Sequence, residues 1–318
     1  MTGALRRMED RDLTQVNLVL SKSFTHAQIE RGFKSKRVPL CRTNFLNMYR
    51  AANPQGAFVI AIRERIVAFS FARIWGRVGW VGPLAVLPEE QGKGQGRQIL
   101  FAALTHLKSQ SMQTIGLEMP ADSPKNLAFY SRLNFLPQQL TVDMVREARG
   151  GPGEVTLNVL RFQNLSGSER HHFLVEAKAL ATCLEEGLDY THEIQTTTMH
   201  RFGDALLVRQ GHDTVGLIIG HTEPYSEIEP RRFLKVNILQ IAPRYGVGIL
   251  NEFIEILEDW AHLDHLQAIY VRVPMRYQAA FDYFVAARFK VVRNEQRMVL
   301  SGYPQRDDPA NVNLSKWE

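Results

Sequence analysis

The 318 residues are enough for two domains of ordinary size, and a composition of 45% hydrophobic and 22% charged residues is typical of a globular protein. No stretch approaches the roughly 18 unbroken apolar residues of a membrane span, and charges at Arg6, Arg7 and Glu9 exclude a secretory signal, so we expect a cytoplasmic protein that binds no membrane. Residues 1–150 hold 21 Lys and Arg against 11 Asp and Glu, whereas the remainder hold 17 against 22, so only the first half is suited to an anionic ligand.

In the first half, helical and strand-like patterns follow one another along the chain. Apolar spacing predicts helices at 13–24 and 45–52, and strand-like runs begin at Ala57, Ile66 and Val78. After them come a glycine-rich loop, "QGKGQGR" at 91–97, a helix with one apolar face, a strand at 114–119, a helix at 124–133 and a last strand at 140–145.

The second half repeats this order after a Gly- and Pro-rich linker at 146–155. The patterns predict helices at 171–186, 250–262 and 278–287, and strands at 205–209, 215–220, 234–241 and 268–273. A gapless shift of 154 residues places Gly92 on Gly246 and Pro120 on Pro274. We therefore expect a duplicated chain with domains at 1–150 and 151–318.

The glycine-rich loop predicts an anion site. A loop between a strand and a helix presents unpaired N–H groups and the positive end of the helix dipole, and glycines bring that backbone close to a ligand. A P-loop is excluded because Gly94, not Ser or Thr, follows Lys93. A dinucleotide fingerprint needs different glycine spacing, although Glu118 lies at about the right distance for a ribose-binding acid. A plain glycine turn is the remaining alternative.

The segment "GPLAVLPEEQGKGQGRQIL" resembles the acyl-CoA loop of the GNAT acetyltransferase superfamily, through Gln91, Gly94, Gly96 and the Val86-x-Pro88 lead-in. The segment "NLAFYSRLNF" is similar to the last helix of that superfamily, with its tyrosine at Tyr130. The chain departs from the pattern of that superfamily at two positions. Asn134 stands where a glycine is usual, and Ser123 stands where many members have an asparagine. Asparagine tolerates the left-handed conformation, so we expect the turn at Asn134 to survive.

The resemblance implies an α/β (α+β) fold of two tandem GNAT-like domains, each a mixed, mostly antiparallel sheet flanked by helices. It also implies acetyl-CoA as the acyl-donor cosubstrate. By the same resemblance, the strand before the loop pairs with the pantetheine arm, the loop binds the pyrophosphate, and the start of the last helix adds further contacts. The implied cofactor-binding residues are Leu84, Ala85, Val86, Gln91, Gly92, Lys93, Gly94, Gln95, Gly96, Arg97, Ser123, Asn126 and Tyr130.

The implied chemistry is direct attack of an amine on the thioester in a ternary complex. A backbone N–H, which we expect to be that of Val86, stabilises the tetrahedral oxyanion. Tyr130 protonates the leaving thiolate, and Glu118, within an apolar strand, is the candidate general base. An ordinary solvent-facing position is the alternative for Glu118. Cys41 has no adjacent base, so no covalent route is expected.

The second half lacks the same features. The shift of 154 puts Val247 at Lys93, Leu250 at Gly96, Asn251 at Arg97 and Phe284 at Tyr130, and it puts Arg272 at Glu118. We therefore expect a degenerate, non-catalytic GNAT-like domain. The acidic stretch at 223–230 either attracts a cationic amine or is a solvated loop.

The sequence thus predicts an N-acetyltransferase acting on a small-molecule or peptide amine, as a monomer or homodimer. The alternatives are a non-catalytic acyl-CoA-binding regulator and an acyltransferase with a longer acyl donor. No metal site is expected, because the two cysteines, Cys41 and Cys183, and the ten histidines lack ligand spacing. Nucleic acid is not expected either, because the basic residues are scattered.

Overall fold

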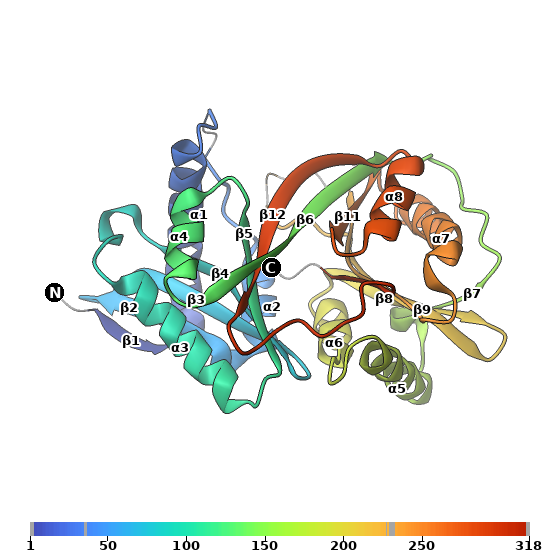
Figure 1. Cartoon of the computed structure of the whole chain (residues 1–318), viewed down its shortest axis with the longest axis horizontal. Helices are drawn as coiled ribbons and strands as arrows, with labels where there is room; N and C mark the ends of the chain where they lie inside the picture. The colour runs from blue at the N-terminus through green and yellow to red at the C-terminus, as the bar shows by residue number, and fades with distance from the viewer. Residues whose placement is uncertain (1–2, 35–36, 227, 229–232, 316–318) are drawn as a thin grey trace.

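The computed structural model describes residues 3–34, 37–226, 228 and 233–315. Two lobes of helices flank a continuous sheet (Figure 1). The elements of the first half are β1 (Ala4–Arg7), α1 (Leu13–Glu30), α2 (Thr43–Ala52), β2 (Ala57–Ile62), β3 (Arg65–Trp75), β4 (Val78–Val86), α3 (Gln95–Ser109), β5 (Thr114–Pro120), α4 (Pro124–Ser131) and β6 (Phe135–Glu147).

The elements of the second half follow the same order. They are β7 (Asn158–Arg161), α5 (Gly167–Leu184), α6 (Thr191–Met199), β8 (Gly203–Gln210), β9 (Asp213–His221), β10 (Phe233–Ile241), α7 (Leu250–Leu263), β11 (Ala268–Pro274), α8 (Gln278–Ala286), β12 (Lys290–Leu300) and β13 (Val312–Ser315). The helices and strands predicted from the sequence are confirmed. The sequence patterns missed β1, β7, α6, β12 and β13.

The two halves exchange their long strands. The sheet order is β1-β2-β3-β4-β5-β12-β6-β11-β10-β9-β8-β7, and β13 adds to β10. β6 therefore pairs with β12 and β11 of the second half, while β12 of the second half pairs with β5. The two strands run side by side through the middle of the molecule (Figure 1). The two tandem folds thus share one continuous sheet, and β6 does not close the first half on itself.

The strand register confirms the duplication. Glu118 of β5 lies opposite Arg297 of β12, and their equivalents under the shift of 154, Arg272 of β11 and Asp143 of β6, also lie opposite each other. Where β6 and β12 pair, Thr141 lies opposite Glu295, its own equivalent. A local two-fold axis therefore passes through that pair.

The backbone repeats with the same shift. Asn134 and its equivalent Arg288 have φ of 64° and 66°, and Ser111 and its equivalent His265 have φ of 56° and 55°. Non-glycine residues adopt this left-handed conformation rarely, so the matched positions are unlikely to arise from unrelated turns. The left-handed turn expected at Asn134 is confirmed.

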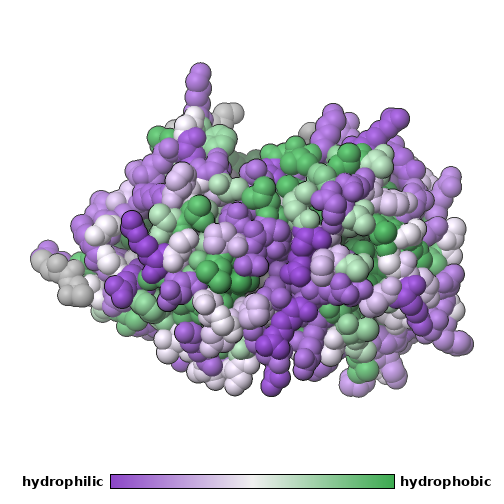
Figure 2. All heavy atoms as spheres, viewed as in Figure 1, coloured by the Kyte–Doolittle hydropathy of each residue, from purple (hydrophilic) through white to green (hydrophobic). Residues whose placement is uncertain are grey.

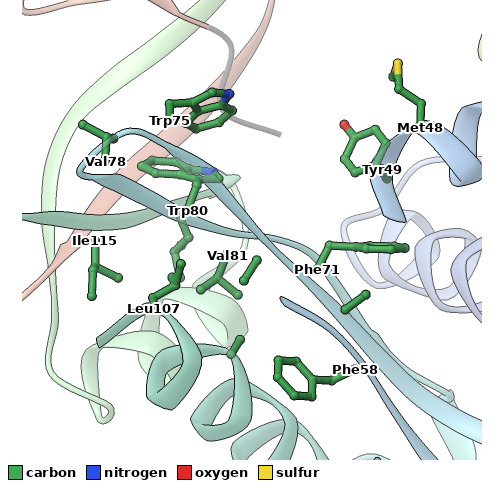
Figure 3. Packing of buried hydrophobic residues seen from close by; sticks show 14 of the residues in the cluster. Met48, Tyr49, Phe58, Phe71, Trp75, Val78, Trp80, Val81, Leu107 and Ile115 are labelled. Atoms are coloured by element: carbon green, nitrogen blue, oxygen red, sulfur yellow. The ribbon is translucent and has the colours of Figure 1, made fainter. Parts of the chain in front are cut away.

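Two apolar cores cross the boundary between the halves. The larger includes the sheet of the first half and α5 of the second, and the smaller includes Val142 and Met144 of β6 together with α7 and α8. Figure 3 shows part of the larger core, with Tyr49 of α2 near Phe71 of β3, and Leu107 of α3 near Ile115 of β5. Polar side chains dominate much of the outer face drawn in Figure 2, with scattered apolar patches.

Candidate functional site

The central feature of the first half is the divergence of two neighbouring strands. β4 and β5 pair in parallel only from Val78 to Trp80, opposite Thr114 to Gly116. Beyond Trp80, β4 stays paired with β3, and no strand of the described chain pairs with its other edge. The two strands thus diverge beyond Trp80 and leave one edge of β4 without a strand beside it.

The backbone of β4 presents polar groups to this divergence. The amide of Leu87 donates to Val67 O on the β3 side, at 2.9 Å. Because successive residues of a strand direct their backbone groups to opposite edges, Val86 and Leu84 face away from β3. The carbonyl of Val86 accepts from Ser23 Oγ at 3.0 Å and from Gln91 Nε2 at 3.1 Å, in agreement with this direction. The amide of Val86 is therefore directed away from β3, to the side where β4 and β5 diverge.

The glycine-rich loop connects β4 to α3 by two left-handed glycines. Gly92 has φ of 75°, and Gly94, at the N-cap of α3, has φ of 88°, conformations that favour glycine. The first intrahelical bond runs from Gln98 N to Gly94 O, so the amides of 95–97 have no partner within the helix. Gly96 has no positive φ, but a Cβ there would come within 3.3 Å of the Phe129 ring. These residues form an anion cradle that suits a pyrophosphate.

The other residues predicted in the loop have distinct surroundings. The amide of Gln91 donates to Pro88 O, so that amide belongs to the turn before the loop. Lys93 Nζ lies 3.1 Å from Glu90 Oε2, and the exposed Arg97 guanidinium lies 5.3 Å from the Phe101 ring centroid. Both cations remain next to the cradle and accessible to a phosphate.

Lys125, which the sequence patterns missed, lies at the same cradle. Its Nζ lies 2.8 Å from Gln91 Oε1 and 2.9 Å from Glu30 Oε1. A second ion pair, from Arg31 Nε to Asp122 Oδ1 at 2.6 Å, lies beside it. These two pairs connect the end of α1 to the β5–α4 turn, and we call them the α1–α4 clasp.

The start of α4 is held by a cap, and its end carries the predicted acid. Ser123 Oγ accepts from the amide of Asn126 at 3.4 Å, so Ser123 fixes the helix start. Tyr130 contacts the rings of Phe129 and Phe135 at centroid distances of 5.0 and 5.8 Å. Burial raises the pKa of Tyr130 to about 12, so the phenol keeps its proton at neutral pH and can donate a hydrogen bond to a thiolate.

Glu118 lies in a buried ionic network. Its carboxylate accepts from Arg272 Nη1 at 2.9 Å, Arg297 Nε at 2.9 Å and Thr141 Oγ1 at 2.8 Å. Its side chain is only 2% exposed, and Arg272 also binds Asp143. A carboxylate held by two guanidinium groups is poorly suited to take a proton from an amine, so these surroundings do not favour Glu118 as the general base. They indicate a structural role at the junction of the two halves.

In the second half, the equivalent loop has another conformation. Gly248 lacks the positive φ of Gly94, and residues Gly246–Ile249 form a 3-10 helix whose following amide, Leu250 N, donates to Val247 O. Leu250 itself is fully buried. Before the loop, equivalent residues of the two halves are one position further apart than the shift of 154. Ala242 N donates to Val215 O as Leu87 N donates to Val67 O, so Ala242 is the structural equivalent of Leu87. The second half thus has a shorter loop that is wound into a helix.

The second half covers the face of the first half that α2 occupies. Arg42 N donates to Tyr225 O at 2.8 Å, and the rings of Phe45 and Tyr225 stack at 4.5 Å. Glu223 pairs with Arg42, so this acid is engaged within the protein, while residues 227, 229 and 230 of the acidic stretch lie outside the described residues. A cavity of about 20 Å³ lies at this junction, lined by Tyr49, Arg73, Trp75, Glu193, His221, Tyr225, Asn237 and Ile238.

The described residues contain neither a cluster of metal-ligating side chains nor a helix that could cross a membrane. In that part of the chain, no group of three or more His, Cys, Asp or Glu residues could hold a metal ion. Among the helices described, none is long and apolar enough to cross a membrane.

Known proteins resemble the first half in sequence and the whole chain in fold. The model of the acetyltransferase (GNAT) family matches residues 24–135. The mycothiol acetyltransferase of Streptomyces griseus is 30% identical over 90 residues, which are 28% of this chain and 29% of that protein. The mycothiol acetyltransferase of Streptomyces coelicolor is 29% identical over 89 residues, which are 27% of this chain and 29% of that protein. The match thus spans less than a third of these relatives.

Solved structures resemble the chain almost end to end. A putative acetyltransferase from Pyrococcus horikoshii superposes with a TM-score of 0.65 at 14% identity, covering 98% of this chain and 96% of its own. A tandem GNAT protein from the clavulanic acid biosynthesis pathway superposes with a TM-score of 0.62 at 12% identity, covering 95% and 99%. The chain therefore has the fold of tandem GNAT proteins, and residues 24–135, which include its diverging strands, match the model of the acetyltransferase (GNAT) family.

Proposed function

We propose that the protein is an acetyl-CoA-dependent N-acetyltransferase whose first half carries the chemistry. The observation that carries the proposal is the cradle at the diverging strands: the amides of 95–97 have no partner within α3, and the amide of Val86 faces the side where β4 and β5 diverge, where we propose the acyl-CoA groove. The site suits acetyl-CoA because the positive-φ glycines leave the loop backbone uncovered and two accessible cations, Lys93 and Arg97, lie beside it. The acceptor is a primary amine of a small molecule or peptide.

In this mechanism the residues of the chain bind, orient and stabilise. The amides of α3 and the cations of the loop bind the pyrophosphate, and the edge of β4 at Leu84–Val86 aligns the pantetheine arm in the groove. When bound, acetyl-CoA supplies an activated acyl group. The amide of Val86 stabilises the oxyanion that forms when the amine attacks, and the Tyr130 hydroxyl donates to the leaving thiolate.

The amine must lose its proton before the attack. An amine of ordinary pKa, about 10.4, is almost wholly protonated at neutral pH. Because Glu118 is bound by two arginines, we propose that the proton leaves through water in the groove and not through this carboxylate.

The second half has a different role in this proposal. Its loop is a 3-10 helix with a fully buried Leu250 where the first half has Gly96, and we propose that it neither binds acyl-CoA nor catalyses transfer. Its contacts with α2 suggest that it shapes the acceptor side of the first half.

The test uses the Gly96→Leu variant, which copies the second half. Since a Cβ at Gly96 already comes within 3.3 Å of Phe129, a leucine either displaces that ring or covers the α3 amides. We expect the Kd for CoA, measured by calorimetry, to rise about 100-fold or more, a loss of about 2.7 kcal/mol.

The matched control is Leu250→Ala, which removes the equivalent side chain from the second half. It leaves a core cavity and lowers the Tm, but we expect the Kd for CoA to change less than about 2-fold below that temperature. Normal CoA binding by a folded Gly96→Leu protein would refute the assignment of the site. Tight CoA binding without turnover of any amine would instead indicate a regulator.

A further inference from the structure

The last described strand, β13, lies where the strands of the second half diverge. β10 and β11 pair in parallel from Phe233 to Val236, opposite Ala268 to Val271, and then separate. Beyond that point β13 pairs antiparallel with β10 and also lies against β11. Both halves thus have diverging strands, and in the second half a strand of the chain itself occupies the gap.

β13 pairs with the residues that correspond to the proposed pantetheine-binding edge. With the one-residue offset at this strand, residues 84–86 of β4 correspond to 239–241 of β10, and these lie opposite 314, 313 and 312 of β13. Because the amide of Ala242 donates toward β9, the backbone groups of Ile241 and Leu239 face β13. The edge that would bind an arm of the cofactor is therefore already paired.

The strand is an integral part of the interior. Its four residues are each only 1–2% exposed, and Val312 and Leu314 belong to the second apolar core. Gln240 Nε2 donates to Asn313 Oδ1 at 2.9 Å, and Arg297 Nη2 donates to Ser315 O at 2.9 Å. Side-chain contacts on both sides thus fix the register that the backbone pairing sets.

We propose that β13 fills the cofactor groove of the second half and excludes acyl-CoA from it, so that the chain has a single acyl-CoA site. A pantetheine arm carries two amide groups, and a peptide strand offers the same donors and acceptors to a strand edge. The identity of the excluded ligand rests on the proposed function, whereas the filling of the groove rests on the pairing of β13 alone.

Hydrogen exchange of the full-length chain tests separately whether β13 fills the groove and whether acyl-CoA is the excluded ligand. We expect peptides covering 239–241 to be protected without ligand and unchanged by saturating CoA. Peptides covering 84–86 should gain protection when CoA is added, because the amides of Leu84 and Val86 face the groove. No change at 84–86 would count against the proposed function. A gain at 239–241, or two CoA molecules per chain by calorimetry, would overturn the inference about β13.

A variant pair tests whether the pairing of β13 stabilises the fold. Leu314→Pro removes the amide that faces Leu239, and we expect its Tm to fall by about 5 °C or more and the protection at 239–241 to be lost. Leu314→Met keeps the amide and nearly the same volume, so its Tm and protection should change little. Equal behaviour of the two variants would contradict the role of the strand.

Discussion

Tyr130 is the residue whose surroundings best fit its proposed chemical task. Its neighbour Phe129 lies over Gly96, and burial raises the pKa of its phenol to about 12. The hydroxyl therefore remains a donor across the pH range of an assay. We expect Tyr130→Phe to lower kcat about 100-fold with an unchanged Kd for CoA, measured by thiol release and by calorimetry.

The control for Tyr130 is Tyr283→Phe, on the equivalent helix of the second half. It removes a phenolic hydroxyl from a half-buried tyrosine that has no place in the proposed mechanism. We expect wild-type kcat and Kd for this variant. An unaltered kcat in Tyr130→Phe would remove the phenol from the mechanism and leave Tyr130 as a packing residue.

Glu118 lies in surroundings that favour a structural role over the predicted role of general base. Its carboxylate is bound by Arg272 and Arg297, and removing one partner of a buried ion cluster leaves charges uncompensated. We expect Glu118→Gln to destabilise the fold by about 3–5 kcal/mol, measured by urea unfolding, while the pH profile of kcat/KM keeps its shape. A stable variant that has lost the acidic limb of that profile would restore Glu118 as the base, because protonation of a general base lowers kcat/KM at low pH.

At the scale of elements, the α1–α4 clasp places a cation at the mouth of the groove. Lys125 Nζ is shared between Gln91 of the loop and Glu30 of α1. We expect Lys125→Gln to raise the Kd for CoA about 10-fold, and Glu30→Gln to lower it, because the second change frees Lys125 for a phosphate.

Calorimetry at low and high salt checks this pair of opposite effects. Both changes in Kd should become smaller as the salt concentration increases, because the charged groups of Lys125 and Glu30 are exposed and salt screens them. The Tm should change little in either variant, because exposed ion pairs contribute about 1 kcal/mol or less. Parallel changes of Kd in the two variants would exclude Lys125 as a phosphate ligand.

The elements themselves were largely predictable, and their pairing was not. Local periodicity identified α3, β5 and β10 because each has one apolar face or a buried run. Nothing in a local pattern states which strand lies beside which, so the exchange of β6 and β12 and the insertion of β13 were missed. β12 was also concealed by the charged residues within "KVVRNEQRMVL", two of which, Lys290 and Arg293, lie in the exposed first part of the strand.

One long-range signal was nevertheless present in the sequence. The shift of 154 residues places Arg272 on the position of Glu118 and Arg297 on that of Asp143. Opposite charges at equivalent positions of a duplicated fold can meet across a local two-fold axis, and here they do, from Arg272 to Glu118 at 2.9 Å. The sequence therefore predicts the central ion cluster when all four residues, Glu118, Asp143, Arg272 and Arg297, are considered together. Glu118 considered alone does not predict it.

At the scale of the whole molecule, a buried carboxylate joins the halves in addition to the shared strands, and a second buried carboxylate lies within the second half. Glu185, at the end of α5, accepts from Thr114 Oγ1 of β5 at 3.2 Å, and Asp307 pairs with Arg276 at 3.0 Å in the segment that leads to β13. Burial raises the pKa of Glu185 to about 7 and that of Asp307 to about 6. Both groups are thus protonated in the folded chain at pH values where they are ionised in the unfolded chain.

This difference predicts a stability that falls as the pH rises. The folded state binds more protons than the unfolded state between about pH 4 and 7, so the contribution of each carboxyl is fully present below its unfolded pKa and is lost as the pH passes its folded pKa. For Glu185 the loss is on the order of 3 kcal/mol, since one pKa unit corresponds to about 1.4 kcal/mol. We expect a lower Tm at pH 8 than at pH 5.5 by calorimetry. The Glu185→Gln variant should show a flatter dependence, because its amide stays neutral throughout, and an equally steep dependence in that variant would place the titrating group elsewhere.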